Sequence, residues 1–253
     1  MKRSKRSGRQ YHLGVGPGDV APRVMLVGDP DRAERVAQRF EAIRGKWRHR
    51  EYVTITGRHE GLELTVTGTG IGPDNTEIAV IELAQCRRDL TFIRVGTCGG
   101  LQRETRVGDL VVSTAAVRLE STSRFFVPEG FPAVASLAVT QALVEACRES
   151  GGRHHVGITA SAAGFYGAQS RHAPGFAPLF PDLPRDMARL GVLNFEMETS
   201  ALFTLAAIGR LRAGAVCVVY AHRPTGRVIP ARDRAGAEAR AIDVGLRAFE
   251  LLA

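Results

Sequence analysis

Short apolar runs alternate along this chain with segments in which apolar residues recur at helical spacing. The apolar and β-branched runs predict strands over residues 24–28, 91–95, 109–115, 155–162 and 213–221. The helical spacing predicts helices over residues 32–40, 76–87, 135–150, 194–209 and from about 234 to the end. Such alternation is typical of a mixed or mostly parallel sheet with helices on both faces. We therefore predict the α/β class, as a single three-layer α/β/α domain around a central mixed sheet.

Two β-branched runs within residues 51–70 predict a β-hairpin, because they flank a turn that holds Gly57 and Gly61. The proline-rich stretch 172–184 is typical of a surface loop. With 253 residues, of which 44% are hydrophobic, the chain can bury a sizeable core as one domain. No apolar run approaches the roughly 18 residues of a membrane span, so no membrane partner is expected.

Four cysteines are scattered along the chain without a CxxC pair. Free thiols in a reducing compartment are therefore expected in place of disulfides or a zinc site. This reasoning predicts a cytoplasmic protein without a metal centre.

The formal net charge of +8 is concentrated in the first ten residues, which hold five basic side chains and no acidic one. A short basic polar segment is usually disordered and solvated. We predict a disordered tail over residues 1–10 and a folded domain over 11–253. A basic nucleic-acid-binding module is an alternative, but no motif beyond the tail supports it, so nucleic acid is not expected as the main partner.

Two segments at the ends of predicted strands carry residues suited to an anion. At the first, Gly28 permits the close approach of a ligand, and Arg32 lies in the first turn of the next helix. At the second, Arg94 offers a planar fork of donors, Gly96 exposes backbone and Thr97 offers a hydroxyl. Taken singly, each segment favours a capped turn or a structural ion pair. Together, on the same kind of strand end, they favour an anion site.

The segment FEMETS places Glu196 and Glu198 on either side of Met197. On a helix, residues i and i+2 point to different faces, so these carboxylates are not expected to form a matched pair. Each alone is interpreted as solvated. The alternative is that one is directed into a site, where Glu198 would accept hydrogen bonds from two sugar hydroxyls.

An aromatic ring, an amide and a guanidinium lie close together in the sequence at Phe165, Gln169 and Arg171. This combination suits a flat ligand with polar edges, such as a base. The structural alternative is a phenylalanine in the core followed by two polar residues on a turn.

Nine segments from about Tyr11 to the C-terminus resemble the uridine phosphorylases of the nucleoside phosphorylase family, in the same order. They are YHLGV, VGDPDR, HREYVTITG, TGTGIG, RVGTCGG, VGDLVVSTAAVRL, VGITASAAGFYGAQSR, GVLNFEMETSALFTLA and HRPTGRVIP. The resemblance implies a nucleoside phosphorylase-like subunit in a trimer-of-dimers hexamer. It also implies cleavage of uridine, and of other pyrimidine nucleosides, with phosphate into a free base and ribose 1-phosphate.

The resemblance further implies roles for the residues at matching positions. The phosphate would be held by Gly28, Arg32, Arg94, Gly96 and Thr97, with Arg50 reaching in from the adjacent subunit. The ribose would meet Glu196, Met197 and Glu198, with His12 of the adjacent subunit near the 5′-hydroxyl. The base would lie near Phe165, Gln169, Arg171, Tyr220 and Ala221, under a lid that carries Arg223. Without the resemblance, His12 and Arg50 would be interpreted as ordinary surface residues.

The sequence departs from the family near the expected base site, where Tyr220, Ala221 and His222 replace aliphatic residues and asparagine. Purine-cleaving relatives carry an aspartate in this region that protonates the purine ring, and none is present here. A pyrimidine is therefore favoured over the purine alternative, although His222 is ionisable and could change the preference.

No cofactor is implied, because inorganic phosphate is a co-substrate. Relatives hold a monovalent cation at the dimer interface, and the matching residues here are Glu51, Ile71 and Asn75. Asparagine in place of serine weakens the expectation of bound potassium. A nucleoside hydrolase of the same superfamily is the remaining alternative, but it would use water and would have no need of three arginines around an anion.

Overall fold

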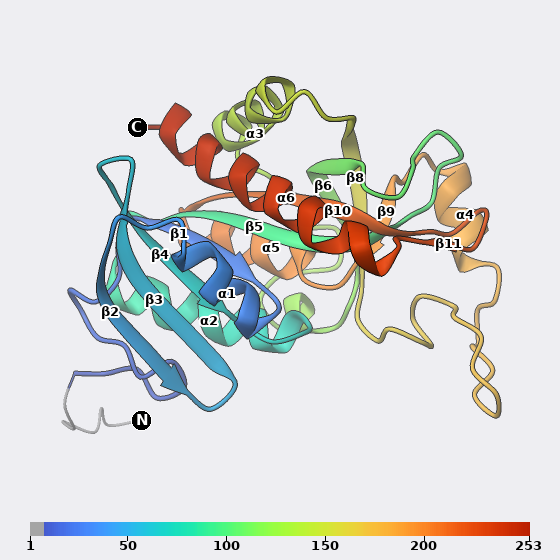
Figure 1. Cartoon of the computed structure of the whole chain (residues 1–253). Helices are drawn as coiled ribbons and strands as arrows, with labels where there is room; N and C mark the ends of the chain where they lie inside the picture. The colour runs from blue at the N-terminus through green and yellow to red at the C-terminus, as the bar shows by residue number, and fades with distance from the viewer. Residues whose placement is uncertain (1–7) are drawn as a thin grey trace.

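The computed structural model describes residues 8–253, which form eleven strands and six α-helices (Figure 1). The strands are β1 (Arg23–Val27), β2 (Ala42–His49), β3 (Tyr52–His59), β4 (Leu62–Gly68), β5 (Thr91–Gly100), β6 (Leu110–Leu119), β7 (Ala133–Val134), β8 (His154–Ala162), β9 (Asn194–Glu196), β10 (Arg212–His222) and β11 (Arg227–Val228). The helices are α1 (Pro30–Ala37), α2 (Pro73–Cys86), α3 (Leu137–Glu149), α4 (Leu183–Arg189), α5 (Thr199–Gly209) and α6 (Ala231–Leu251), with a short 3₁₀ helix at Thr122–Phe125. Residues 1–7 of the predicted tail lie outside the described residues.

All eleven strands belong to one mixed sheet, in the order β11-β10-β6-β8-β9-β5-β1-β4-β3-β2, with β7 on β6. Strand β10 pairs with β5 in parallel and with β6 in antiparallel fashion, so β5, β10, β6, β8 and β9 close into a circuit. Strands β4, β1, β5 and β10 run parallel. Their carboxyl ends therefore share the edge of the sheet where ligands of such folds bind.

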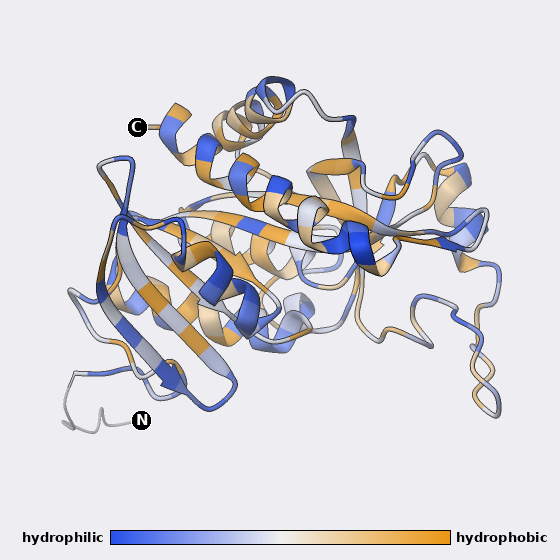
Figure 2. Ribbon diagram, viewed as in Figure 1, coloured by the Kyte–Doolittle hydropathy of each residue, from blue (hydrophilic) through white to orange (hydrophobic). Residues whose placement is uncertain are grey.

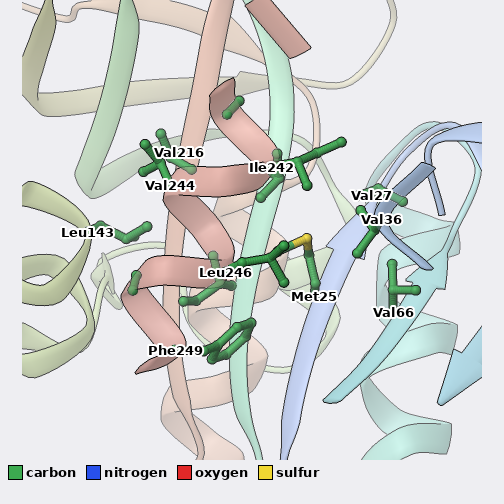
Figure 3. Close-up of a cluster of buried hydrophobic side chains, with 14 of the residues drawn as sticks. Met25, Val27, Val36, Val66, Leu143, Val216, Ile242, Val244, Leu246 and Phe249 are labelled. Carbon is green, nitrogen blue, oxygen red and sulfur yellow. The ribbon is translucent and has the colours of Figure 1, made fainter. Parts of the chain in front are cut away.

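Alternating side chains of the central strands build a core on each face of the sheet. Met25 and Val27 of β1 pack with residues of α1, α3 and α6 (Figure 3). Val24 and Leu26 of the same strand pack with residues of α2 and α5. The orange stretches of Figure 2 follow these buried strands. The predicted α/β/α arrangement with a central mixed sheet is confirmed.

Strand β5 is longer than predicted, because it continues through the whole RVGTCGG segment to Gly100. The last residue pair between β1 and β5 is Leu26 with Arg94, whereas β5 pairs with β10 as far as its own last residue, Gly100. The prediction that the strand ends at Val95 was therefore wrong. From Val95 onward, β5 extends past its pairing with β1.

An edge strand, a helix and a turn also differ from the sequence prediction. The missed strand β2 is a largely exposed edge strand with charged residues, so it lacks an apolar period. Helix α4 begins within the predicted loop, at Leu183. The hairpin turn lies at Glu60 and Gly61, with φ of 47° and 73°. Gly57 lies inside β3 instead, where a Cβ atom would come within 2.4 Å of the carbonyl oxygen of Ala42.

All four cysteines are free thiols, as predicted. Burial raises the pKa of Cys147 and of Cys217 to about 12, so both thiols stay protonated near neutral pH. Within residues 8–253, no helix combines the length and apolar character needed to cross a membrane.

Gly68 ends β4 where α1 packs against it, and a Cβ atom there would lie 2.8 Å from the Cα atom of Pro30. Because backbone cannot yield as a flexible side chain does, Gly68→Ala is expected to lower the free energy of unfolding by roughly 1–3 kcal/mol. Urea denaturation measures this effect. Gly130→Ala is the control, because a Cβ atom there meets nothing within 4 Å. Equal stability of the two variants would contradict the packing argument.

Candidate active site

The centre of the candidate site is the guanidinium of Arg94, which projects from β5 and is only 5% exposed. Its Nε donates to the Oε2 of Glu196 at 3.1 Å, and one of its terminal nitrogens donates to Glu198. The prediction that the two carboxylates are solvated and point to different faces was wrong. Both are buried, and both bind the same arginine.

The expected helix over 194–209 is divided, and this division brings the two carboxylates together. Residues Asn194–Glu196 pair with β5 and β8 as strand β9, and α5 begins only at Thr199. The Glu196 carboxylate accepts the backbone N–H groups of Glu198 at 2.9 Å and of Thr199 at 3.0 Å, as well as the hydroxyl of Ser161. Glu196 is therefore held by the first turn of α5 as well as by Arg94.

Glu198 has fewer partners than Glu196 and is better placed to bind a ligand. Besides Arg94, its carboxylate accepts the N–H of Gly72 at 2.7 Å. Burial raises the pKa of Glu198 above its ordinary value, while the charge of Arg94 opposes that shift. Burial acts to lower the pKa of Arg94, but the carboxylates of Glu198 and Glu196 outweigh it and raise this pKa above its ordinary value. Arg94 therefore stays a cation at the floor of the site.

The conformation of Arg94 explains the glycine at position 96. The side chain of Arg94 lies along β5 toward Gly96, so a Cβ atom on Gly96 would lie 2.8 Å from a guanidinium nitrogen. Thr97 follows in the same strand and is partly exposed. At Gly28 a Cβ atom would be in ordinary contact, 3.4 Å from the carbonyl oxygen of Gly70, so packing alone does not require that glycine.

Arg32 of α1 reaches β5 at Val95, the residue that follows Arg94. Its guanidinium is 8% exposed, and one terminal nitrogen lies 3.5 Å from the carbonyl oxygen of Val95. The other terminal nitrogen binds Glu238 of α6 at 2.9 Å. Among the described residues, the buried Nε of Arg32 has no hydrogen-bond partner. Arg32 thus reaches the residue that follows Arg94 in β5, and its unpartnered Nε is a donor available for an anion.

The residues predicted to hold a base gather near the end of β5. The guanidinium carbon of Arg171 lies 4.0 Å from the ring centroid of Phe165, and a terminal nitrogen of Arg171 donates to Oε1 of Gln169 at 3.3 Å. Arg223 donates to the carbonyl oxygen of Gln169 at 2.9 Å. A Cβ atom on Gly99 would meet both arginine side chains within 3.6 Å.

Arg171 and Arg223 form a region that favours negative charge. Within residues 8–253, the buried Nε of Arg171 and one terminal nitrogen of Arg223 lack hydrogen-bond partners. Burial lowers the pKa of Arg171, and the neighbouring charge of Arg223 lowers it further. A ligand group that gains negative charge beside these donors would be stabilised.

The three residues that depart from the family pattern point in different directions. Strand β10 has an irregularity between Val219 and Ala221, and Ala221 pairs with Gly99 near Arg171. Tyr220 instead lines a hollow of about 320 Å³ between α1 and α6, with Glu238. The ring of His222 contacts the hydroxyl of Thr225 at 2.6 Å and the carbonyl oxygen of Gln102 at 3.1 Å.

A sequence model described as "Phosphorylase superfamily" matches residues 22–247. The chain belongs to the phosphorylase superfamily. It is 47% identical to the uridine phosphorylase of Thermococcus kodakarensis over 234 residues, which cover 91% of this chain and 83% of that one. It is 38% identical to the Escherichia coli uridine phosphorylase, across 96% of this chain and 97% of the relative. A DeoD-type purine nucleoside phosphorylase of Roseobacter denitrificans is 33% identical, across 94% and 97%. The resemblance stated from the sequence motifs is thus confirmed.

His12 and Arg50 lie close to each other but apart from Arg94 and the two carboxylates that bind it. The backbone N–H of His12 and its ring Nδ1 contact the carboxylate of Glu82, the ring at 2.7 Å. Arg50 has a φ of 53° and donates to the hydroxyl of Tyr11 at 3.0 Å. These bonds hold both side chains at the N-terminal segment and the β2–β3 turn.

Sequence reasoning missed several residues that hold the candidate site in this phosphorylase-superfamily chain. They are Gly72, Glu82, Ser161 and Glu238. Only Glu238 leaves a signal in the sequence, because it is an acidic residue at helical spacing from Ala241, Ile242 and Gly245, which are buried in α6.

The residues expected at a cation site are close to one another. A Cβ atom on Gly70 would lie 2.6 Å from Nδ2 of Asn75 and 3.9 Å from Cγ of Glu51. The side chain of Ile71 is exposed. Among residues 8–253, no group of three histidine, cysteine, aspartate or glutamate side chains has a metal-binding arrangement. That Asn75 disfavours bound potassium stays a prediction.

Proposed function

We propose that this chain is a uridine phosphorylase, which cleaves uridine with phosphate into uracil and ribose 1-phosphate. The proposal rests on two buried guanidinium groups at β5. One belongs to Arg94, and the other belongs to Arg32, which reaches the carbonyl oxygen of Val95 and has a buried Nε without a partner among the described residues. The names of the relatives at 47% and 38% identity support the same activity. The purine alternative has weaker support, from a relative at 33% identity.

The proposed reaction needs no protein nucleophile. A phosphate oxygen would bond to C1′ of the ribose while the C1′–N1 bond breaks and its electron pair stays with uracil. Arg32 and Arg94 would hold the phosphate in line, which supplies orientation. Glu198 would accept hydrogen bonds from the ribose hydroxyls, beside Met197 and Glu196. Thr97 and the backbone of Gly28 and Gly96 would complete the phosphate site.

The leaving base would take up negative charge, and Arg171 is the residue proposed to stabilise it. Gln169 would bind the uracil edge, Phe165 would stack near the base, and Arg223 would close over it. Ala221 would line the same pocket. Tyr220 lies in the hollow beside Glu238, so its proposed influence on the base would act from the Arg32 side of the site.

Base release from uridine, thymidine, inosine and adenosine, each with and without phosphate, tests this function. Rapid release from uridine that depends on phosphate is the expected result. Faster release from inosine or adenosine than from uridine would contradict the choice of base. Equal release from uridine in phosphate-free buffer would instead favour the hydrolase.

We also propose that the active site is shared between subunits of a hexamer. His12 and Arg50 are bound to Glu82 and Tyr11, and within residues 8–253 no hydrogen bond joins them to Arg94 or Glu198. Activity should therefore require at least a dimer. Light scattering combined with an activity assay checks this, and a fully active monomer would refute it.

The remaining proposals concern location and chain organisation. The free thiols are in keeping with the cytoplasm, which we propose as the location of the enzyme. We propose residues 11–253 as the phosphorylase domain, which the family match over 22–247 supports.

A further inference from the structure

Glu238 lies between two arginines of α1, although it comes from α6 near the other end of the chain. Its side chain is 11% exposed, and its Oε2 lies 2.9 Å from a terminal nitrogen of Arg32. Its Oε1 accepts the Nε of Arg35. Arg35 in turn binds Asp29 at 2.8 Å, and Asp29 caps α1 through the N–H of Asp31. Four alternating charges thus connect α6 to the first turn of α1.

This arrangement fixes one end of the Arg32 guanidinium and leaves the rest available. The nitrogen bound to Glu238 is engaged, whereas the buried Nε has no partner among the described residues. The other terminal nitrogen has only the 3.5 Å contact with the carbonyl oxygen of Val95. A guanidinium is planar and rigid, so fixing one nitrogen also fixes the directions of the remaining N–H groups.

We infer that Glu238 is a positioning residue, which holds Arg32 in the orientation that binds phosphate. This inference rests on the proposed function. The opposite role, competition with phosphate for Arg32, is disfavoured by Arg35. Arg35 also binds the Glu238 carboxylate. If a phosphate took the place of this carboxylate on Arg32, Arg35 would still hold the carboxylate in its position. Since Glu238 occupies one terminal nitrogen of Arg32, the phosphate would use the remaining donors.

The test is steady-state kinetics of Glu238→Gln with uridine and phosphate varied separately. Glu238→Gln should raise the KM for phosphate by roughly tenfold, because the guanidinium loses its fixed direction. The KM for uridine should stay within about twofold. Glu238→Ala should have a larger effect, because glutamine still offers one acceptor oxygen. The matched control is Asp243→Asn, which removes an exposed α6 carboxylate that binds Arg39 at 3.0 Å; its KM for phosphate should equal that of the wild type.

Arg35→Gln provides a second variant in case the Glu238 variants fail to fold, since the Arg35 side chain is 43% exposed and Glu238 is 11% exposed. It should raise the same KM by a smaller factor, because Glu238 then loses one of its two holders. A KM for phosphate that is unchanged or lowered in the folded variants, with a phosphate-dependent wild type, would overturn the positioning role. A wild type that releases uracil without phosphate would instead overturn the proposed function. Calorimetric titration with inorganic phosphate separates binding from turnover.

Discussion

Arg94→Ala is expected to lower the free energy of unfolding by about 3–5 kcal/mol, because it leaves two buried carboxylates without their counter-ion. Glu196 and Glu198 are both buried, and both bind the guanidinium that the substitution removes. Urea denaturation measures the effect. Arg189→Ala is the control, because this arginine is exposed and forms an i,i+3 pair at 3.7 Å; its expected change is below about 0.5 kcal/mol.

The same substitution should also impair phosphate use. Loss of one charge-assisted hydrogen bond to phosphate would cost roughly 1.5–3 kcal/mol in kcat/KM for phosphate. The double variant Arg94→Ala with Glu198→Gln separates the two effects. It should recover part of the stability, because one uncompensated charge is gone, but none of the phosphate use. An Arg94→Ala enzyme with wild-type stability would contradict the described charge network.

Arg171→Ala is expected to lower turnover on uridine by about 10²-fold, the usual effect of removing a donor from developing charge. The reason is that negative charge on the departing uracil grows toward the transition state, so the lost contact is stronger there than in the ground state. The KM for phosphate should change by less than about threefold, because Arg171 lies with Phe165 and Gln169 and has no described contact with Arg94.

Arg171→Lys is the matched comparison, because it keeps the charge but loses the planar fork. It should recover only part of the turnover, and neither variant should gain activity on purine nucleosides. Kinetics with uridine and inosine measure both effects. An Arg171→Ala enzyme with wild-type turnover would mean that the base is held elsewhere, and the proposed role of Arg171 would have to be withdrawn.

Strands and helices were predictable from the sequence where the apolar residues of a segment recur with a single clear period. Val24–Val27 alternate between two cores, and this alternation on a short apolar run is what a strand covered on both faces requires. The exposed edge strand β2 has no such period. The division of residues 194–209 into β9 and α5 was not predictable either, because pairing of Asn194–Glu196 with β5 and β8 overrides a local helical pattern.

Arg32 and Arg94 were predicted as anion-binding cations, but the burial of Glu196 and Glu198 as partners of Arg94 was not predicted. Arg94 lies in β5 beside the end of β1, and Arg32 lies in the helix that follows β1, so both arginines come to the same edge of the sheet. The ion pairs that orient them depend on side chains far apart in sequence. Glu238 binds Arg35 across 203 residues, and Glu198 binds Arg94 across 104. Such contacts depend on how α5 and α6 pack on the sheet, which one sequence does not reveal.

The most direct test of the central claim is the identity of the sugar that leaves the enzyme with uracil. Uridine would be incubated with the full chain in isotopically labelled water, with and without phosphate, and the products followed by phosphorus NMR spectroscopy and mass spectrometry. We expect one ribose 1-phosphate for each uracil in phosphate, no label in the sugar, and almost no uracil without phosphate. Free ribose that carries oxygen from water, formed at the same rate in both buffers, would contradict that claim.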